Sequence, residues 1–199
     1  MAHIDYYFAT LSPYTYLAGT RFEEIAKKHG ATVNYKPVDL PALFARTGGV
    51  LPFDRHPSRQ EYRAQDLVRR ARDLDLPFHI KPAFFPVNAA PSAYAVVAAQ
   101  SAGGGDLGAL VHAMTRAVWA DEKDLADTAV IRACLEEAGF DSALAESGLL
   151  EGAETYAANL EQAVAAGVFG APFYVTDDDA RFSRSVLTSP CAYKCGTAS

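Results

Sequence analysis

Cysteine is scarce in this chain of 199 residues, which contains only Cys134, Cys191 and Cys195. Three cysteines cannot build the dense disulfide framework of a small secreted protein, so a cytoplasmic location is expected. Cys191 and Cys195 lie close together, but none of the five histidines is near them. Because a closed metal site needs more ligands than two thiolates, no metal site is expected.

Basic residues are outnumbered, and long apolar runs are missing. The 18 Lys and Arg against 24 Asp and Glu give a formal net charge of -6, which argues against a nucleic-acid partner. No apolar run reaches the roughly 20 residues of a membrane span. The first eight residues lack a basic segment followed by an apolar one, so they are expected to begin the fold and not to form a signal peptide. Half of the residues are hydrophobic, which suffices for one domain, with or without a large insertion.

The start of the chain has the pattern of a strand, a helix and a second strand. Residues 4–9 are short and aromatic-rich, as in a strand. Ser12 followed by Pro13 is a helix-start signal, and helical spacing continues towards Gly30. Residues 31–38 are expected to form the second strand, after which Pro41 is expected to break the chain. This order predicts a βαβ unit.

The middle of the chain is expected to be a loop followed by helices, and the end returns to a mixed pattern. The expected loop covers residues 47–57, and the expected helices cover 58–74, 92–100, 107–119 and 127–137. A helix over 153–166, a strand over 173–175, a turn over 176–179 and a return strand at 181–182 then follow. This order predicts an α/β core interrupted by a helical subdomain.

Two segments together resemble one known family. They are residues 7–18 (YFATLSPYTYLA) and residues 167–173 (GVFGAPF). The pair resembles the 2-hydroxychromene-2-carboxylate isomerases and kappa-class glutathione transferases, within the wider DsbA-like thioredoxin fold. Weaker matches extend the resemblance over residues 3–182; they are Thr47-Gly48, Tyr62, Asp66-Leu67 and Ala117-Val118-Trp119. The resemblance implies a thioredoxin-like core (1–40 plus 151–199), a helical insertion (41–150) and a homodimer.

Ser12 is the candidate catalytic residue. In DsbA-like oxidoreductases the turn between the first strand and its helix carries Cys-x-x-Cys, and here the tetrad is Ser12-Pro13-Tyr14-Thr15. Without a cysteine at this turn, dithiol exchange is excluded there. A hydroxyl at a helix N-terminus favours an anion. The resemblance implies that this anion is the thiolate of bound glutathione, although the Ser-Pro pair taken alone is more often only a helix cap.

The other end of the expected glutathione site lies near the C-terminus. The resemblance implies a cis bond between Ala171 and Pro172, with the backbone of Ala171 pairing with glutathione as a strand pairs with a sheet edge. Taken alone, Ala171-Pro172 is equally compatible with an ordinary proline turn. Ser183 and Ser185 are candidate partial replacements for the aspartate and glycine that the family pattern has after the hairpin. The chain after Phe182 departs from that pattern, through either a frameshift or a genuine variant.

The candidate substrate contacts are carried over from the same resemblance. Asp54-Arg55 stands in place of an Asn-Arg pair, and an arginine suits a carboxylate because its guanidinium binds it with two hydrogen bonds. Phe44 replaces a lysine, Phe85 replaces a tyrosine, and Gly49 replaces an asparagine, which predicts a more apolar pocket. Asn88 matches a Phe-Pro-x-Asn stretch of the family, or else is a turn residue.

Arg59 and Arg63 lie one helical turn apart just after this loop. Their charges could make the electrostatic potential of the substrate pocket more positive, but a solvent-exposed charged face of the helix is the simpler explanation.

Three functions are compatible with these residues. The leading hypothesis is a glutathione-dependent cis-trans isomerase of an aromatic 2-oxo-enoic acid, in which the glutathione thiolate adds to the conjugated double bond and leaves again after rotation. The second is a kappa-type glutathione transferase or peroxidase, which consumes glutathione. The third is a non-catalytic thioredoxin-like binding protein. Binding of glutathione separates the first two from the third.

Overall fold

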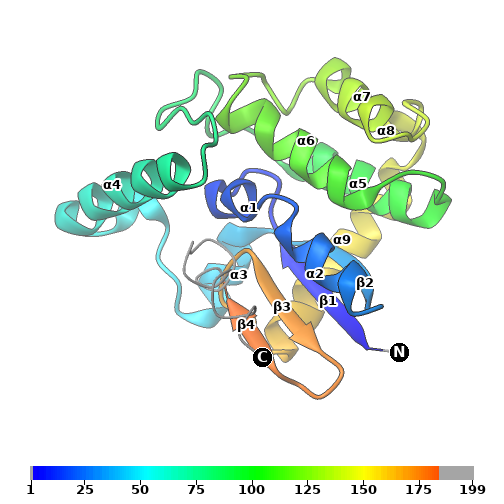
Figure 1. Ribbon diagram of the computed structural model, residues 1–199, viewed down its shortest axis with the longest axis horizontal. Helices are drawn as coiled ribbons and strands as arrows, with labels where there is room; N and C mark the ends of the chain where they lie inside the picture. The colour runs from blue at the N-terminus through cyan, green and yellow to red at the C-terminus, as the bar shows by residue number, and fades with distance from the viewer. Residues whose placement is uncertain (1, 184–199) are drawn as a thin grey trace.

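The computed structural model describes residues 2–183 and shows a four-stranded sheet with helices on both faces (Figure 1). The strands are β1 (His3–Phe8), β2 (Thr32–Pro37), β3 (Phe173–Thr176) and β4 (Arg181–Ser183), in the order β2-β1-β3-β4. β1 pairs in parallel with β2 and antiparallel with β3, and β3 pairs antiparallel with β4. The expected α/β class is confirmed, and all helices from α3 to α9 lie in the chain between β2 and β3.

The first helical stretch is interrupted, which the sequence did not predict. α1 (Pro13–Ala18) ends at Gly19, and α2 (Arg21–Lys28) starts two residues later. Gly19 has a φ of 59°, in the left-handed region that glycine adopts without steric cost, so the backbone leaves the helical path there. The expectation of one continuous helix was wrong for this reason.

Pro41 starts a helix and does not break the chain, which corrects a second expectation. It lies in the first turn of α3 (Leu40–Thr47), where the missing N–H of proline has no helical partner to lose. The carboxylate of Asp39 caps this helix by accepting a hydrogen bond from the Ala42 N–H at 3.0 Å.

The expected helices after residue 57 are all present, and the 3-10 turn η1 (Pro52–Asp54) and the short α8 (Leu144–Ser147) were not predicted. The turn η1 precedes the long α4 (Pro57–Asp73), which extends away from the sheet beside α1 in Figure 1. The other helices are α5 (Ala90–Ala102), α6 (Leu107–Trp119), α7 (Thr128–Glu137), α8 (Leu144–Ser147) and α9 (Leu149–Ala165). None of the helices in residues 2–183 is both long and apolar enough to cross a membrane.

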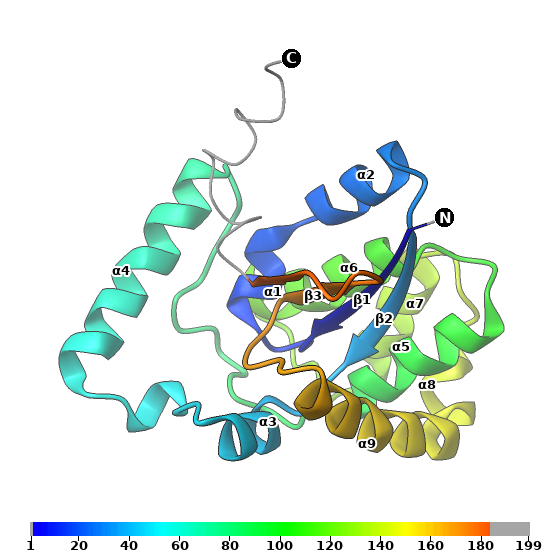
Figure 2. The ribbon, with the colours of Figure 1, turned by 90° about the horizontal axis from the view of Figure 1, so that it is seen from below.

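The alternation of β1 places two hydrophobic clusters on opposite faces of the sheet. Tyr6 and Phe8 belong to the larger cluster, with residues of α1, α2, α5 and α6, whereas Tyr7 belongs to the smaller cluster with residues of α3 and α9. Figure 2 shows α3 and α9 on one side of the sheet and α2 on the other.

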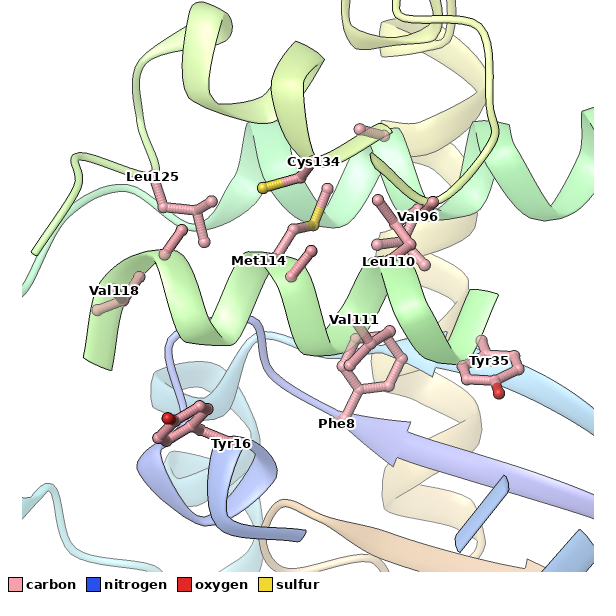
Figure 3. Packing of buried hydrophobic residues seen from close by; sticks show 14 of the residues in the cluster. Phe8, Tyr16, Tyr35, Val96, Leu110, Val111, Met114, Val118, Leu125 and Cys134 are labelled. Atoms are coloured by element: carbon pink, nitrogen blue, oxygen red, sulfur yellow. The ribbon is translucent and has the colours of Figure 1, made fainter. Parts of the chain in front are cut away.

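Helix α6 forms the centre of the larger cluster. Val111 of α6 lies towards Phe8, and Met114 lies towards Cys134 of α7 (Figure 3). The larger cluster therefore contains residues from both expected parts of the chain, 1–40 plus 151–199 and 41–150. The division into these two parts stays a prediction.

Candidate active site

Ser12 lies at the N-terminus of α1, after the short turn that follows β1. Its backbone is extended (φ -79°, ψ 121°), and its Oγ accepts a hydrogen bond from the Thr15 N–H at 3.3 Å, so Ser12 caps the helix as the sequence predicts. The same hydroxyl donates to the carbonyl oxygen of Ala171 at 3.4 Å. Ser12 is only 4% exposed, so its hydroxyl is held between these two partners.

The antiparallel pairing of β1 and β3 brings Ala171 to Ser12. Tyr7 on β1 is opposite Phe173 on β3, so the residues just before β3 lie beside the turn that follows β1. The peptide bond between Ala171 and Pro172 is cis, as expected, and both residues are buried. A second cis bond, between Phe85 and Pro86, was not expected.

A large pocket of about 1190 Å³ opens beside Ser12. Its wall contains every candidate site residue that the structure describes: Ser12, Phe44, Asp54, Arg55, Phe85, Asn88, Ala171, Pro172 and Ser183. Ser185, the remaining candidate, lies outside the described residues. The structure therefore brings residues from six separate stretches of the chain to one cavity of the size of a small-molecule site.

Three arginines face this pocket. Arg55 lines it while its Nε donates to the Val50 carbonyl oxygen at 2.9 Å, which holds the side chain against its own loop. Arg59 and Arg63 also line the pocket, and Arg59 is exposed, as expected for a solvated charged face. Arg63 is half-buried, and its guanidinium lies 5.8 Å from the ring centre of Tyr14, within the range of a cation–π contact. The pocket thus has a positive side in a protein of net negative charge.

Asn88 is a turn residue that also lies in the pocket wall. It lines the pocket, and its Oδ1 accepts a hydrogen bond from the Ala90 N–H at 3.1 Å at the start of α5. Asp54 lies in η1, at the pocket wall, just before Arg55. Phe44 and Phe85 are half-buried, so their rings form part of the apolar lining that the sequence predicts.

Several pocket residues were missed by the sequence analysis. Tyr156 of α9 lines the pocket, and burial, together with the negative charge of Asp39, raises the pKa of its hydroxyl. Phe53, His56 and Phe169 also contribute to the wall. Phe53 and His56 flank the Asp54-Arg55 pair in the sequence, so their position next to a predicted contact was an available signal. Nothing local in the sequence distinguishes Tyr156, because only the packing of α9 brings it to the site.

The polar groups in the described part of the pocket wall are oxygen and nitrogen groups. Within residues 2–183, the pocket wall contains no cysteine. Cys134 is buried in α7, and burial raises the pKa of its thiol to about 11. The described part of the chain also contains no cluster of three or more His, Cys, Asp or Glu residues suited to a metal ion. What the pocket offers is a helix-capping hydroxyl, the backbone of Ala171 just before β3, aromatic rings and guanidinium groups.

Comparison with known proteins places this geometry in a family. The DSBA-like thioredoxin domain matches residues 3–187. The chain belongs to the DsbA-like thioredoxin family. Within that family, a 2-hydroxychromene-2-carboxylate isomerase of Sphingobium xenophagum is 31% identical over 178 residues, which are 88% of this chain and 89% of the relative. The chain is therefore similar to these isomerases over most of its length, as the sequence predicts.

Two further matches support the same placement. A glutathione S-transferase kappa 1 of Caenorhabditis elegans is 33% identical over 85 residues, which cover 42% of this chain and 37% of the relative. The solved structure of a 2-hydroxychromene-2-carboxylate isomerase superposes with a TM-score of 0.71 at 24% identity, covering 99% of this chain and 100% of that chain. This structural match confirms that the chain has the DsbA-like fold, a thioredoxin-like core with a helical insertion.

Proposed function

We propose that this protein is a glutathione-dependent cis-trans isomerase acting on an aromatic 2-oxo-enoic acid. The observation that carries the proposal is the position of the Ser12 hydroxyl, at the start of α1 and 3.4 Å from the carbonyl oxygen of Ala171, in the wall of the large pocket. The similarity to 2-hydroxychromene-2-carboxylate isomerases over 88% of the chain supports the same reaction class.

The residues around Ser12 fit a bound thiol peptide. The Ser12 hydroxyl donates to the backbone oxygen of Ala171, and rotation about its C–O bond would let it exchange this acceptor for a bound thiolate. The N-terminus of α1 adds the positive end of a helix dipole, which favours an anion. Glutathione supplies a thiol nucleophile for reversible addition to a conjugated double bond. Ser12 would hold that sulfur as the thiolate, and Ala171 would pair with the peptide backbone.

The opposite part of the pocket fits the substrate. The guanidinium of Arg55 would bind the carboxylate of a 2-oxo acid and stabilise the enolate charge that develops during the reaction. The rings of Phe44 and Phe85 would contact the aromatic part of the substrate. Asp54 and Asn88 would contribute polar contacts at the wall, and Ser183, with Ser185 beyond the described residues, would contact the γ-glutamyl end of glutathione.

A kappa-type glutathione transferase or peroxidase is the second candidate. The 33% identity to a glutathione S-transferase kappa 1 over 85 residues favours it. The same thiolate at Ser12 would then attack an external electrophile, and the product would leave with the sulfur attached. The two enzymes differ in stoichiometry, because a transferase consumes one glutathione per turnover and an isomerase consumes none.

The deciding experiment measures glutathione binding first and glutathione consumption second. Calorimetric titration of the protein with millimolar glutathione should show saturable binding. Turnover of a benzylidenepyruvate should then interconvert the cis and trans isomers without loss of free thiol. Consumption of thiol in proportion to a chloro-nitrobenzene substrate would favour the transferase. A protein that binds no glutathione would be neither enzyme, and the remaining hypothesis would be a non-catalytic thioredoxin-like binding protein.

A further inference from the structure

Five aromatic side chains form a continuous column that starts at the helix of Ser12 and ends in the pocket wall. The ring centres of Tyr16 and Phe78 are 6.4 Å apart, and those of Phe78 and Trp119 are 5.4 Å apart, with nearly parallel planes in both pairs. Trp119 then contacts Phe85 at 4.8 Å, and Phe85 contacts Phe53 at 6.3 Å, both in tilted arrangements. Phe85 and Phe53 line the pocket, whereas Tyr16 lies one helical turn beyond Ser12. We call these five rings the aromatic column.

Two hydrogen bonds to backbone carbonyl oxygens hold the aromatic column in place. The Tyr16 hydroxyl donates to the carbonyl oxygen of Pro77 at 2.7 Å, and the His79 N–H donates to the carbonyl oxygen of Trp119 at 2.7 Å. These two bonds fix the segment that carries Phe78 between α1 and the end of α6. The column therefore connects the position of Ser12 to the position of Phe85 through a fixed series of contacts.

Trp119 is the central member of the aromatic column. It is the only tryptophan of the chain and is 1% exposed. Its indole N–H is buried and has no hydrogen-bond partner in the part of the chain that the structure describes. A buried donor without a partner costs stability, so hydrogen bonding gives no reason for an indole at this place. What the indole does provide is a large flat surface that touches Phe78 on one side and Phe85 on the other.

We propose that Trp119 is a positioning residue that holds Phe85 as the flat wall against which the aromatic ring of the substrate stacks. This role rests on the proposed function, because it concerns the substrate half of the same pocket. Phe85 is half-buried and has the pocket on one side and Trp119 on the other. Removing the indole would leave Phe85 free to turn into the vacated space, since a cavity next to a partly exposed ring is filled by movement of that ring. The substrate ring would then lose its orientation relative to Ser12.

Kinetics of three variants test this role. Trp119→Phe keeps an aromatic ring in the column, Trp119→Leu removes it, and Leu110→Ala is a matched control, because Leu110 is fully buried in the same helix about 13 Å away along its axis. We expect Trp119→Leu to raise KM for a benzylidenepyruvate about tenfold while the Kd for glutathione stays within a factor of two. Trp119→Phe should raise that KM less than threefold. Leu110→Ala should lower Tm and leave the KM for the benzylidenepyruvate unchanged.

Two kinetic results would overturn the role. One is an unchanged KM for the benzylidenepyruvate in Trp119→Leu. The other is an equal rise of KM in Trp119→Leu and Leu110→Ala, because that result would reflect general loss of stability and not the position of Phe85.

Fluorescence of the wild-type protein gives a second test that does not depend on the folding of any Trp119 variant. Because Trp119 is the only tryptophan, its emission reports directly on the ring next to Phe85. Titration with 2-oxo-4-phenylbutanoate, which has the aromatic ring but lacks the conjugated double bond, should change this emission in a saturable way. Titration with 2-oxobutanoate, which lacks the ring, should not.

The result separates failure of this inference from failure of the proposed function. If calorimetry shows glutathione binding and 2-oxo-4-phenylbutanoate leaves the emission unchanged, the role of Trp119 is overturned and the glutathione site stands. If glutathione does not bind, the proposed function is overturned, and with it the role of Trp119 in positioning the substrate.

Discussion

Phe44 and Gly49 occupy adjoining space so tightly that the second residue has no room for a side chain. A β-carbon added to Gly49 would lie 2.5 Å from Cδ1 and 2.8 Å from Cβ of Phe44, well inside van der Waals contact. The Gly49 N–H also donates to the Phe44 carbonyl oxygen at 3.0 Å, which fixes the two residues relative to each other. The resemblance implies that both residues replace polar ones, and the structure shows that the two positions are sterically coupled at the pocket wall.

We predict that Gly49→Ala destabilises the fold by about 1–3 kcal/mol through overpacking against Phe44. In the Phe44→Ala background the same substitution should cost less by at least about 0.5 kcal/mol, because two of the three close atoms are then gone. Part of the cost should remain, since the β-carbon of residue 44 is still present. Urea unfolding of the four proteins in this double-mutant cycle measures the coupling, and additive effects would contradict it.

Substitutions of Ser12 separate helix capping from the proposed binding of a thiolate. Ser12→Ala should lower stability by about 1 kcal/mol, because the Thr15 N–H loses its acceptor, and should lower turnover by about 10²–10³-fold. Ser12→Asp keeps a capping acceptor but places a negative charge where the thiolate would lie. We therefore expect Ser12→Asp to keep the helix cap, to lose stability through its buried charge beside the Ala171 carbonyl oxygen, and to be as inactive as Ser12→Ala. Thermal unfolding and isomerase assays check both; an active Ser12→Asp would show that the residue only caps the helix.

Burial of the Glu23 carboxyl should make the stability of the fold depend on pH. Its Oε1 accepts a hydrogen bond from the Tyr35 hydroxyl at 3.2 Å, and its buried Oε2 has no hydrogen-bond partner within residues 2–183. Burial raises the pKa of this carboxyl from an ordinary value of 4.5 to about 7. The folded state then holds a proton that the unfolded state releases, so this contribution to stability is complete below about pH 4.5 and is lost as pH rises to about 7.

Glu23→Gln should remove this dependence, because the amide keeps the acceptor for Tyr35 but cannot ionise. Between pH 4.5 and pH 8 we expect the free energy of unfolding of the variant to rise relative to that of the wild type by on the order of 2 kcal/mol. This figure allows for the partial contact of Glu23 with solvent. Unfolding free energies measured in urea across this range give the difference directly. If the unfolding free energies of the two proteins change in parallel across this pH range, Glu23 is not the source of the pH dependence.

Cys134 should be unreactive in the native protein. Its thiol is 5% exposed, and burial raises its pKa to about 11, so almost no thiolate is present or accessible at pH 8. Treatment with iodoacetamide at pH 8, followed by peptide mapping, should leave Cys134 unmodified in the native state and modified in denaturant. Labelling of Cys134 in the native protein at the rate of a small-molecule thiol would contradict its burial.

Local signals in the sequence predicted most elements, and the errors have local causes. The Ser12-Pro13 and Asp127-Thr128 pairs start helices where expected, because capping depends only on residues within one turn. The break at Gly19 was missed, because the apolar spacing continues across it. Pro41 was taken for a chain breaker, because the sequence alone does not show whether a proline ends one segment or begins the next.

The sequence by itself determined the type of chemistry at the turn after β1: a hydroxyl and no thiol, at the start of a helix. The resemblance of two short segments also identified the family and nearly all candidate site residues. Only the tertiary structure showed that the Ser12 hydroxyl bonds directly to Ala171, 159 positions away in the chain, and that Tyr156 lies in the wall of the same pocket. The physical reason is that strand pairing and helix packing set these distances, and both depend on residues far from the site in sequence.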